Sequence, residues 1–116
     1  MRERVKASER LKHILEAMNE IIENKERHSF EEITSDKIIL FGFVKYVEII
    51  GETVYKLTKE FRDQHPEVEW DIIEGMRHVL VHGYYKIKPE QLWDTIENDI
   101  PQLKPLIEEL YNKEIE

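Results

Sequence analysis

The sequence predicts an all-α fold, an antiparallel bundle of four to five helices that forms a single domain over residues 1–116. Three observations point to this fold. Apolar residues recur at helical spacing, only four glycines and four prolines interrupt the chain, and capping residues divide it into segments with short connections. Apolar residues make up 41% and charged residues 36% of the chain, a balance typical of a helical globular domain.

The first element expected is an amphipathic helix over residues 5–22. Its apolar side chains follow the i, i+3, i+4, i+7 spacing of one helical face, and they are Leu11, Ile14, Leu15, Met18, Ile21 and Ile22. Residues 29–32, Ser-Phe-Glu-Glu, then form a capping-box pattern, in which the serine and the second glutamate each accept from the other's backbone N–H. This pattern predicts a short turn of helix after the first long one.

A second long helix is expected to begin at Ser35 or Asp36 and to run to about Gln64. The dipeptide His65-Pro66 should end it, because the residue before a proline disfavours helical dihedrals. Its apolar face is too broad for one neighbour, so part of this face is expected to form a second interface. The apolar residues are Leu40, Phe41, Phe43, Val44, Tyr46, Val47, Ile50, Val54, Tyr55, Leu57 and Phe61.

A third helix is expected over residues 70–81, and Gly83 should end it, since glycine commonly follows a helix C-terminus. Pro89 should start a fourth helix, because proline is tolerated in the first helical turn. Pro101 should interrupt that helix. A last helix should follow, and its apolar residues are Leu103, Leu106, Ile107, Leu110 and Tyr111.

The charge balance limits the classes of function. The net charge is −8, with 25 acidic and 17 basic residues, which argues against a broad basic surface for nucleic acid but leaves room for a small phosphate site. The absence of cysteine excludes disulfides and thiol catalysis. The N-terminal segment lacks the apolar stretch of a secretory signal, and no apolar run approaches the roughly 20 residues of a membrane span. We therefore expect a cytoplasmic protein with no membrane association.

The chemically most informative residues lie at 76–85, where Arg77 and His82 form the pattern Arg-x4-His-x-Tyr. Arginine stays charged and suits phosphate, whereas histidine titrates near neutrality and suits proton transfer. The pair could therefore cut or bind a phosphodiester. His82 could equally be a helix-ending residue that bonds the last carbonyls, and Arg77 could be a surface residue paired with Glu74.

Five residues along a helix correspond to a rotation of roughly 140°, so Arg77 and His82 do not share a face. The two side chains could still converge at the helix end. Alternatively, a two-fold dimer could line one cleft with both residues from both chains.

The neighbouring residues carry less specific patterns. His78 and His82 have the i, i+4 spacing of half a metal site, but no third ligand is evident, so we expect no metal and assign His78 a supporting role. Tyr84 and Tyr85 could bind phosphate, stack on a base or accept a nucleotide, or could simply pack at the helix end. Glu52 interrupts an apolar run, where it either holds Arg77 in place or faces solvent.

Four motifs in order resemble the HepT-like family of the HEPN superfamily. They are Ile-Ile-Gly-Glu at 49–52, His-Pro-Glu-Val-Glu-Trp at 65–70, Gly-Met-Arg-His-Val-Leu-Val-His-Gly-Tyr at 75–84 and Glu-x-x-Trp at 90–93. The resemblance extends from the first helix to Leu103, and the ordered set is far more specific than Arg-x4-His by itself. One departure is His78, because this family usually has asparagine directly after the arginine.

The resemblance implies an HEPN-like helical bundle that forms a homodimer with the two motifs facing each other. It implies a metal-independent ribonuclease, without a cofactor, that acts on RNA as the toxin of a toxin–antitoxin pair. The expected antitoxin is an MntA-like minimal nucleotidyltransferase, which neutralises the toxin by adding AMP to the motif tyrosine. By position, Arg77 and His82 would be the catalytic pair and Tyr84 the AMP acceptor. The alternative is a non-catalytic helical subunit that binds a nucleotide or presents Tyr84 to a separate nucleotidyltransferase.

Overall fold

The computed structural model describes the backbone of residues 2–81 and 88–115 and the side chains of residues 7–75 and 88–115. These residues form helices joined by short connections. In chain order they are α1 (Arg2–Glu26), α2 (Phe30–Ser35), α3 (Lys37–Tyr55), α4 (Lys59–Gln64), α5 (Trp70–Val81), α6 (Pro89–Asp94), the π-helical turn η1 (Thr95–Asp99) and α7 (Ile100–Ile115).

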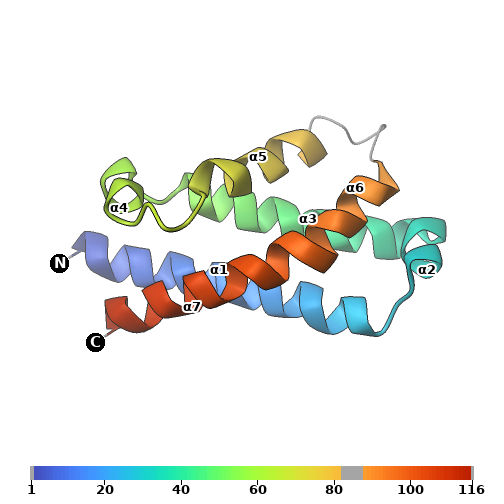
Figure 1. Ribbon diagram of the computed structural model, residues 1–116, viewed down its shortest axis with the longest axis horizontal. Helices are drawn as coiled ribbons and strands as arrows, with labels where there is room; N and C mark the ends of the chain where they lie inside the picture. Colours follow the sequence, from blue (N-terminus) through green and yellow to red (C-terminus); the bar gives the residue numbers. More distant parts are fainter. Residues whose placement is uncertain (1, 82–87, 116) are drawn as a thin grey trace.

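The four long rods of the bundle are α1, α3, α5 and the continuous stretch α6–η1–α7 (Figure 1). Successive rods run in opposite directions, so both chain termini lie at the same end of the molecule (Figure 1). α1 packs against both α3 and α7, and α5 packs against α3. The expected all-α, antiparallel bundle is therefore confirmed.

The core forms where the apolar stripes of α1, α3 and α7 meet, as the helical spacing of these residues requires. Among the described side chains, twelve large ones are less than 2% exposed, including Leu11, Ile14, Met18, Ile50, Ile73 and Leu110. The stripe predicted for the first helix is correct, although α1 continues to Glu26, four residues beyond the predicted end.

The predicted capping box is present at the start of α2. The Ser29 hydroxyl accepts a hydrogen bond from the backbone N–H of Glu32, and the Glu32 carboxylate accepts one from the backbone N–H of Ser29. Asp36, one of the two residues predicted to cap the next helix, caps α3 by accepting from the N–H groups of Ile38 and Ile39. Both caps satisfy N–H groups that a helix start leaves without partners.

The prediction of one helix from Asp36 to Gln64 is wrong, because the chain turns after Tyr55 and starts α4 at Lys59. The Thr58 hydroxyl accepts a hydrogen bond from the N–H of Phe61 at 3.0 Å, which is an N-cap that the apolar pattern concealed. α4 does end at Gln64, immediately before His65-Pro66, as predicted.

The predicted interruption at Pro101 is also wrong. Helix α6 starts at Pro89 as expected, but the chain then passes through the π turn η1 and continues directly into α7, with Pro101 in its first turn. A π turn shifts the backbone hydrogen-bond register by one residue, and such turns can accommodate a proline that lacks an N–H. The result is one long rod instead of two helices.

Helix α3 has apolar side chains on both its buried and its solvent-facing sides. Ile38 is 84% exposed, and Phe41 and Tyr55 are also exposed, so α3 keeps apolar surface toward solvent. The second interface expected on this helix stays a prediction. Within residues 2–81 and 88–115, no helix combines the length and hydropathy that would let it cross a membrane.

Candidate functional site

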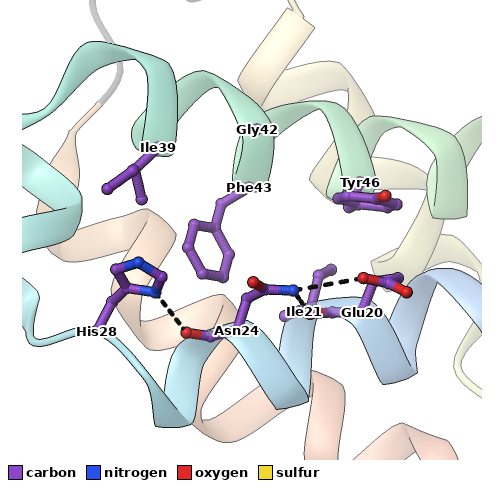
Figure 2. Close-up of a pocket in the computed structure, with 8 residues that line it drawn as sticks. All are labelled: Glu20, Ile21, Asn24, His28, Ile39, Gly42, Phe43 and Tyr46. Carbon is purple, nitrogen blue, oxygen red and sulfur yellow. Dashed lines mark hydrogen bonds between the residues drawn. The ribbon is translucent and has the colours of Figure 1, made fainter.

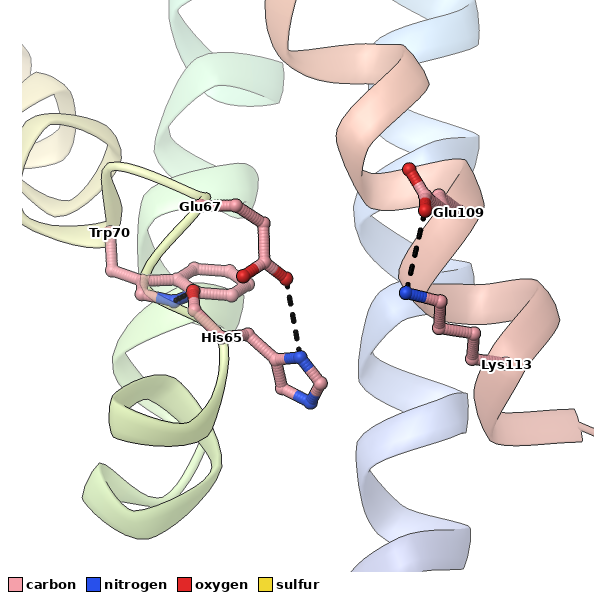
Figure 3. A network of polar contacts seen from close by, with 5 residues as sticks. All are labelled: His65, Glu67, Trp70, Glu109 and Lys113. Atoms are coloured by element: carbon pink, nitrogen blue, oxygen red, sulfur yellow. Dashed lines mark hydrogen bonds and ion pairs between the residues drawn. The ribbon is translucent and has the colours of Figure 1, made fainter.

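The candidate site is carried by α5, whose bounds, Trp70–Val81, match the predicted helix. The start of α5 is held by Trp70, which is buried and donates a hydrogen bond from its indole Nε1 to the carbonyl oxygen of His65 at 2.9 Å (Figure 3). The imidazole Nδ1 of His65 lies 3.3 Å from a carboxylate oxygen of Glu67 (Figure 3). The Phe61 ring packs against the His65 imidazole and the Trp70 indole. The turn before α5 is therefore fixed by side chains on both sides of Pro66.

A second contact fixes α5 against α4. Arg62 Nη1 lies 3.1 Å from Glu74 Oε2, and both side chains are partly buried. Glu74 is the residue that could have paired with Arg77 one turn later on the same helix. The structure pairs the Glu74 carboxylate with Arg62, so this carboxylate joins α5 to α4.

The side of α5 that faces α3 is defined by Trp70 and Ile73, both buried, whereas the neighbouring Ile72 is 53% exposed. Position 77 comes four residues after Ile73 and continues the same i, i+3, i+7 register. Position 77 is therefore in helical register with the two buried residues Trp70 and Ile73.

The predicted site residues fall in three groups. Arg77 and His78 belong to α5, but their side chains lie outside the part of the chain that is described. His82, Tyr84 and Tyr85, together with the predicted helix stop at Gly83, lie outside the described residues. Glu52 is fully described and lies on α3, where it is partly buried.

Glu48, one helical turn before Glu52 on α3, is a carboxylate that the sequence analysis missed. Its side chain is 8% exposed, which makes it one of three buried polar or charged residues among those described. A buried carboxylate is costly unless it is paired, and Glu48 does have an interaction partner. Glu48 directly follows Val47 of the apolar stripe, and this position in the sequence could have indicated that its carboxylate is buried. Glu48 and Glu52 are therefore two acidic residues one helical turn apart on α3.

The described residues 7–75 and 88–115 contain no group of three or more His, Cys, Asp or Glu side chains placed to hold a metal ion.

Comparison with known proteins assigns the chain to a family. Residues 14–110 match the family described as ribonuclease HepT-like. The chain belongs to this family. A relative from Caldanaerobacter subterraneus subsp. tengcongensis, named as a candidate RNase, is 40% identical over 104 residues, or 90% of this chain and 93% of the relative. No solved structure matches the chain.

Archaeal relatives carry similar names. A protein of Thermococcus cleftensis, named as a probable ribonuclease HepT, is 36% identical over 100 residues, or 86% of this chain and 91% of the relative. A candidate RNase of Methanocaldococcus jannaschii is 34% identical over 103 residues, or 89% and 84% of the two chains. The resemblance to HepT-like proteins of the HEPN superfamily is therefore confirmed, and with it the enzyme class, ribonuclease, at the level of the family.

Proposed function

We propose that the chain is a metal-independent endoribonuclease in which Arg77 and His82 cleave RNA in a cleft between two copies of the chain. The main support is the position of the motif. A ribonuclease family match covers residues 14–110, and within this range α5 carries Arg77 on a helix that is fixed at its start by Trp70 and Arg62. We further propose that the enzyme acts in the cytoplasm as the toxin of a toxin–antitoxin pair.

The proposed reaction is an internal transesterification. His82 takes the proton of a ribose 2′-hydroxyl, the 2′-oxygen attacks the adjacent phosphorus, and the bond to the 5′-oxygen breaks. The leaving oxygen is then protonated, which yields a 2′,3′-cyclic phosphate and a 5′-hydroxyl end. Arg77 stabilises the extra negative charge on the phosphorane-like transition state. A cation and a proton carrier suffice for this step, so no metal is invoked.

Glu52 is proposed to hold Arg77, and His78 to support the site as a polar neighbour. The packing of α5 against α3 favours this pairing, because Glu52 lies on α3 and position 77 continues the α5 stripe that faces it. A guanidinium held by a carboxylate keeps its orientation as the phosphate changes charge. Buried Glu48, one turn earlier, offers a second acidic residue on the same helix.

A homodimer would solve the geometric problem posed by Arg77 and His82, which are separated by roughly 140° around a single helix. A two-fold axis next to α5 would bring Arg77 of one chain toward His82 of its partner. The exposed apolar side chains Ile38 and Phe41 on α3, the helix against which α5 packs, supply apolar surface for such an interface.

An MntA-like nucleotidyltransferase is the proposed antitoxin. It would transfer AMP from ATP to the phenolic oxygen of Tyr84, with release of pyrophosphate. The added phosphate would place negative charge two residues from His82, where it would compete with the phosphate of RNA. Intact-mass measurement of the protein co-expressed with such an enzyme, with and without Tyr84→Phe, tests this assignment.

The nuclease itself is tested by incubating purified protein with RNA in the presence of EDTA. The proposal expects cleavage that ends in cyclic phosphates and that is lost in Arg77→Ala and in His82→Ala. If both variants cleave RNA as fast as the wild type, the catalytic assignment is wrong.

The second candidate function is a non-catalytic subunit that presents Tyr84 to a nucleotidyltransferase. The net charge of −8 favours it, since an RNA enzyme commonly carries a basic surface. Expression of the chain without a partner distinguishes the two functions. Growth arrest and RNA cleavage support the nuclease, whereas their absence together with AMP transfer supports the passive subunit.

A further inference from the structure

A groove runs between α1 and α3 on a side of the molecule that the proposed nuclease chemistry does not use. It consists of two adjoining cavities of about 320 and 580 Å³, and Glu20 and Tyr46 line both of them. It lies where α3 faces α1, whereas Arg77 lies on α5, which packs elsewhere on α3. The groove therefore needs an explanation of its own.

The first cavity has an apolar floor and a polar rim. Phe43 and Ile39 of α3 point into it, while Asn24 and His28 approach from α1 and from the turn that follows α1 (Figure 2). His28 Nδ1 lies 2.7 Å from the backbone oxygen of Asn24, which fixes the imidazole at one end. The cavity can therefore take an apolar stem that ends in a polar head.

Asn24 and Glu20 supply the oxygen atoms of the polar rim, and these atoms can bind a cation. The side-chain Nδ2 of Asn24 donates to the backbone oxygen of Glu20 at 2.8 Å and to the Glu20 carboxylate at 3.4 Å. The side-chain oxygen Oδ1 of Asn24 is therefore turned toward Phe43 (Figure 2). The Tyr46 ring lies across the groove from Glu20 (Figure 2). A carbonyl oxygen, a carboxylate and an aromatic face are together the groups that receive a guanidinium or an ammonium.

The ionisable side chains that line the groove include two glutamates and the histidines His13 and His28. Glu16 in the second cavity and Glu20 in both are exposed carboxylates, and none of the described residues that line the two cavities is Lys or Arg. Such a surface repels the phosphates of RNA and attracts basic groups. Glu16 and Glu20 are one helical turn apart on α1, so a basic helix with the same residue spacing can meet both.

Gly42 keeps the groove open. It lies inside α3, where glycine is less favourable than alanine because it gives the unfolded chain more conformational freedom. A Cβ atom built on Gly42 would meet no other atom within 4 Å, so packing within the chain does not require glycine here. Gly42 lines the first cavity, where a side chain would occupy the space that a ligand needs.

We propose that this groove binds a basic amphipathic helix of a partner protein, with two Arg or Lys residues one turn apart that pair with Glu16 and Glu20. The stem of one basic residue lies on Phe43 and Ile39, and its head meets Glu20 and the Asn24 carbonyl oxygen. This interaction goes beyond the proposed nuclease function and does not depend on it, because its residues are separate from Arg77 and His82.

The test is an NMR titration of the full-length, ¹⁵N-labelled protein with a synthetic amphipathic helical peptide that has arginines at positions i and i+4. A companion peptide with citrulline in place of both arginines keeps the shape and removes the charge. The proposal expects shift changes confined to α1 and α3 around the groove. It also expects the citrulline peptide to bind at least about tenfold more weakly, because citrulline keeps the hydrogen-bonding shape but loses the charge that pairs with the glutamates.

Substitutions inside and outside the groove test whether peptide binding depends on the groove or only on the negative charge of the protein. Glu16→Gln with Glu20→Gln should weaken binding of the arginine peptide about tenfold, whereas Glu23→Gln, an exposed residue of α1 outside the groove, should leave it unchanged. Gly42→Leu should abolish binding without loss of helicity in circular dichroism, because leucine fills the cavity and favours helix.

Equal binding of the two peptides, or shift changes centred on α5, overturns the proposal. A Gly42→Leu variant that binds the peptide normally also overturns the proposal. So does a Gly42→Leu variant that changes the protein from dimer to monomer, because the groove would then bind a second copy of the chain. Arg77→Ala should bind the peptide like the wild type, so failure of the nuclease assignment and failure of this one are distinguishable.

Discussion

Arg62 of α4 and Glu74 of α5 form an ion pair in which Nη1 and Oε2 are 3.1 Å apart, and their side chains are 22% and 32% exposed. This pair joins the helix that carries Arg77 to the preceding one across the turn that contains Pro66. Arg62 Nε is buried and has no hydrogen-bond partner among the described groups, so the guanidinium depends on Glu74 for compensation.

Arg62→Met should therefore lower the free energy of unfolding by about 1–2 kcal/mol, because it leaves a partly buried carboxylate without its cation. Urea unfolding followed by circular dichroism measures this change. Lys113→Met is the matched control, since Lys113 and Glu109 form a largely exposed pair at 3.4 Å (Figure 3). The control should change stability by less than about 0.5 kcal/mol. Equal effects of both substitutions would show that the α4–α5 pair has no special role.

The packing of α5 on α3 is tested by two adjacent isoleucines. Ile73 is 0% exposed and Ile72 is 53% exposed, so the same substitution has different consequences at the two positions. Ile73→Val should lower the free energy of unfolding by about 0.5–1.5 kcal/mol, because it removes a buried methyl group and leaves a cavity.

Ile72→Val removes the same group from a largely solvated position and should change the free energy of unfolding by less than about 0.5 kcal/mol. Thermal unfolding of the two variants side by side decides the matter. A larger loss for Ile72→Val would mean that the face of α5 assigned to α3 is wrong, and with it the register of position 77.

Asp99, in the π turn, gives a pH dependence with a definite sign. Burial, and secondly the nearby Asp94 carboxylate, raise the pKa of Asp99 above its ordinary value. The folded state therefore binds the proton more tightly than the unfolded state, and stability falls as the pH rises through the raised pKa. Asp99→Asn should remove this penalty, so that the variant is more thermostable at neutral pH and equal to the wild type in acid.

Glu32 provides the comparison of opposite sign. Hydrogen bonds from the backbone and the hydroxyl of Ser29 hold the pKa of Glu32 below its ordinary value. Its contribution is present above the ordinary pKa and is lost as the pH falls through the lowered one. Glu32→Gln should therefore reduce the loss of stability in acid, whereas Asp99→Asn should not. Melting temperatures measured from acid to neutral pH would contradict this assignment if both variants shifted in the same direction.

The sequence was most informative where one residue type determines the local backbone. Ser29 accepts a hydrogen bond from an N–H group at the start of α2, and Pro89 has no N–H that would need a partner at the start of α6. Both helices start where predicted. The prediction failed where a hydroxyl competed with a continuous apolar pattern. Thr58 caps a new helix, α4, although the apolar spacing continues from Leu57 to Phe61. The spacing of apolar residues therefore does not reveal the break between α3 and α4.

The candidate site was harder to predict than the fold. Apolar spacing located α5 with correct ends, but spacing along one chain does not show which residues of another helix lie beside it. Glu52 was selected because it interrupts an apolar run, whereas Glu48, the more deeply buried carboxylate, lay inside the apolar stripe and was missed. Arg62 as the partner of Glu74 was missed for the same reason, since their pairing depends on the turn between α4 and α5.

The most direct test of the central claim mixes two inactive variants. Arg77→Ala and His82→Ala proteins, each purified, are combined under conditions that allow subunit exchange, and RNA cleavage is measured in EDTA. If each site combines Arg77 of one chain with His82 of its partner, hybrid dimers contain one intact site of two, and the mixture should regain about a quarter of wild-type activity. A mixture as inactive as either variant, despite hybrid dimers confirmed by native mass spectrometry, would contradict a site shared between chains.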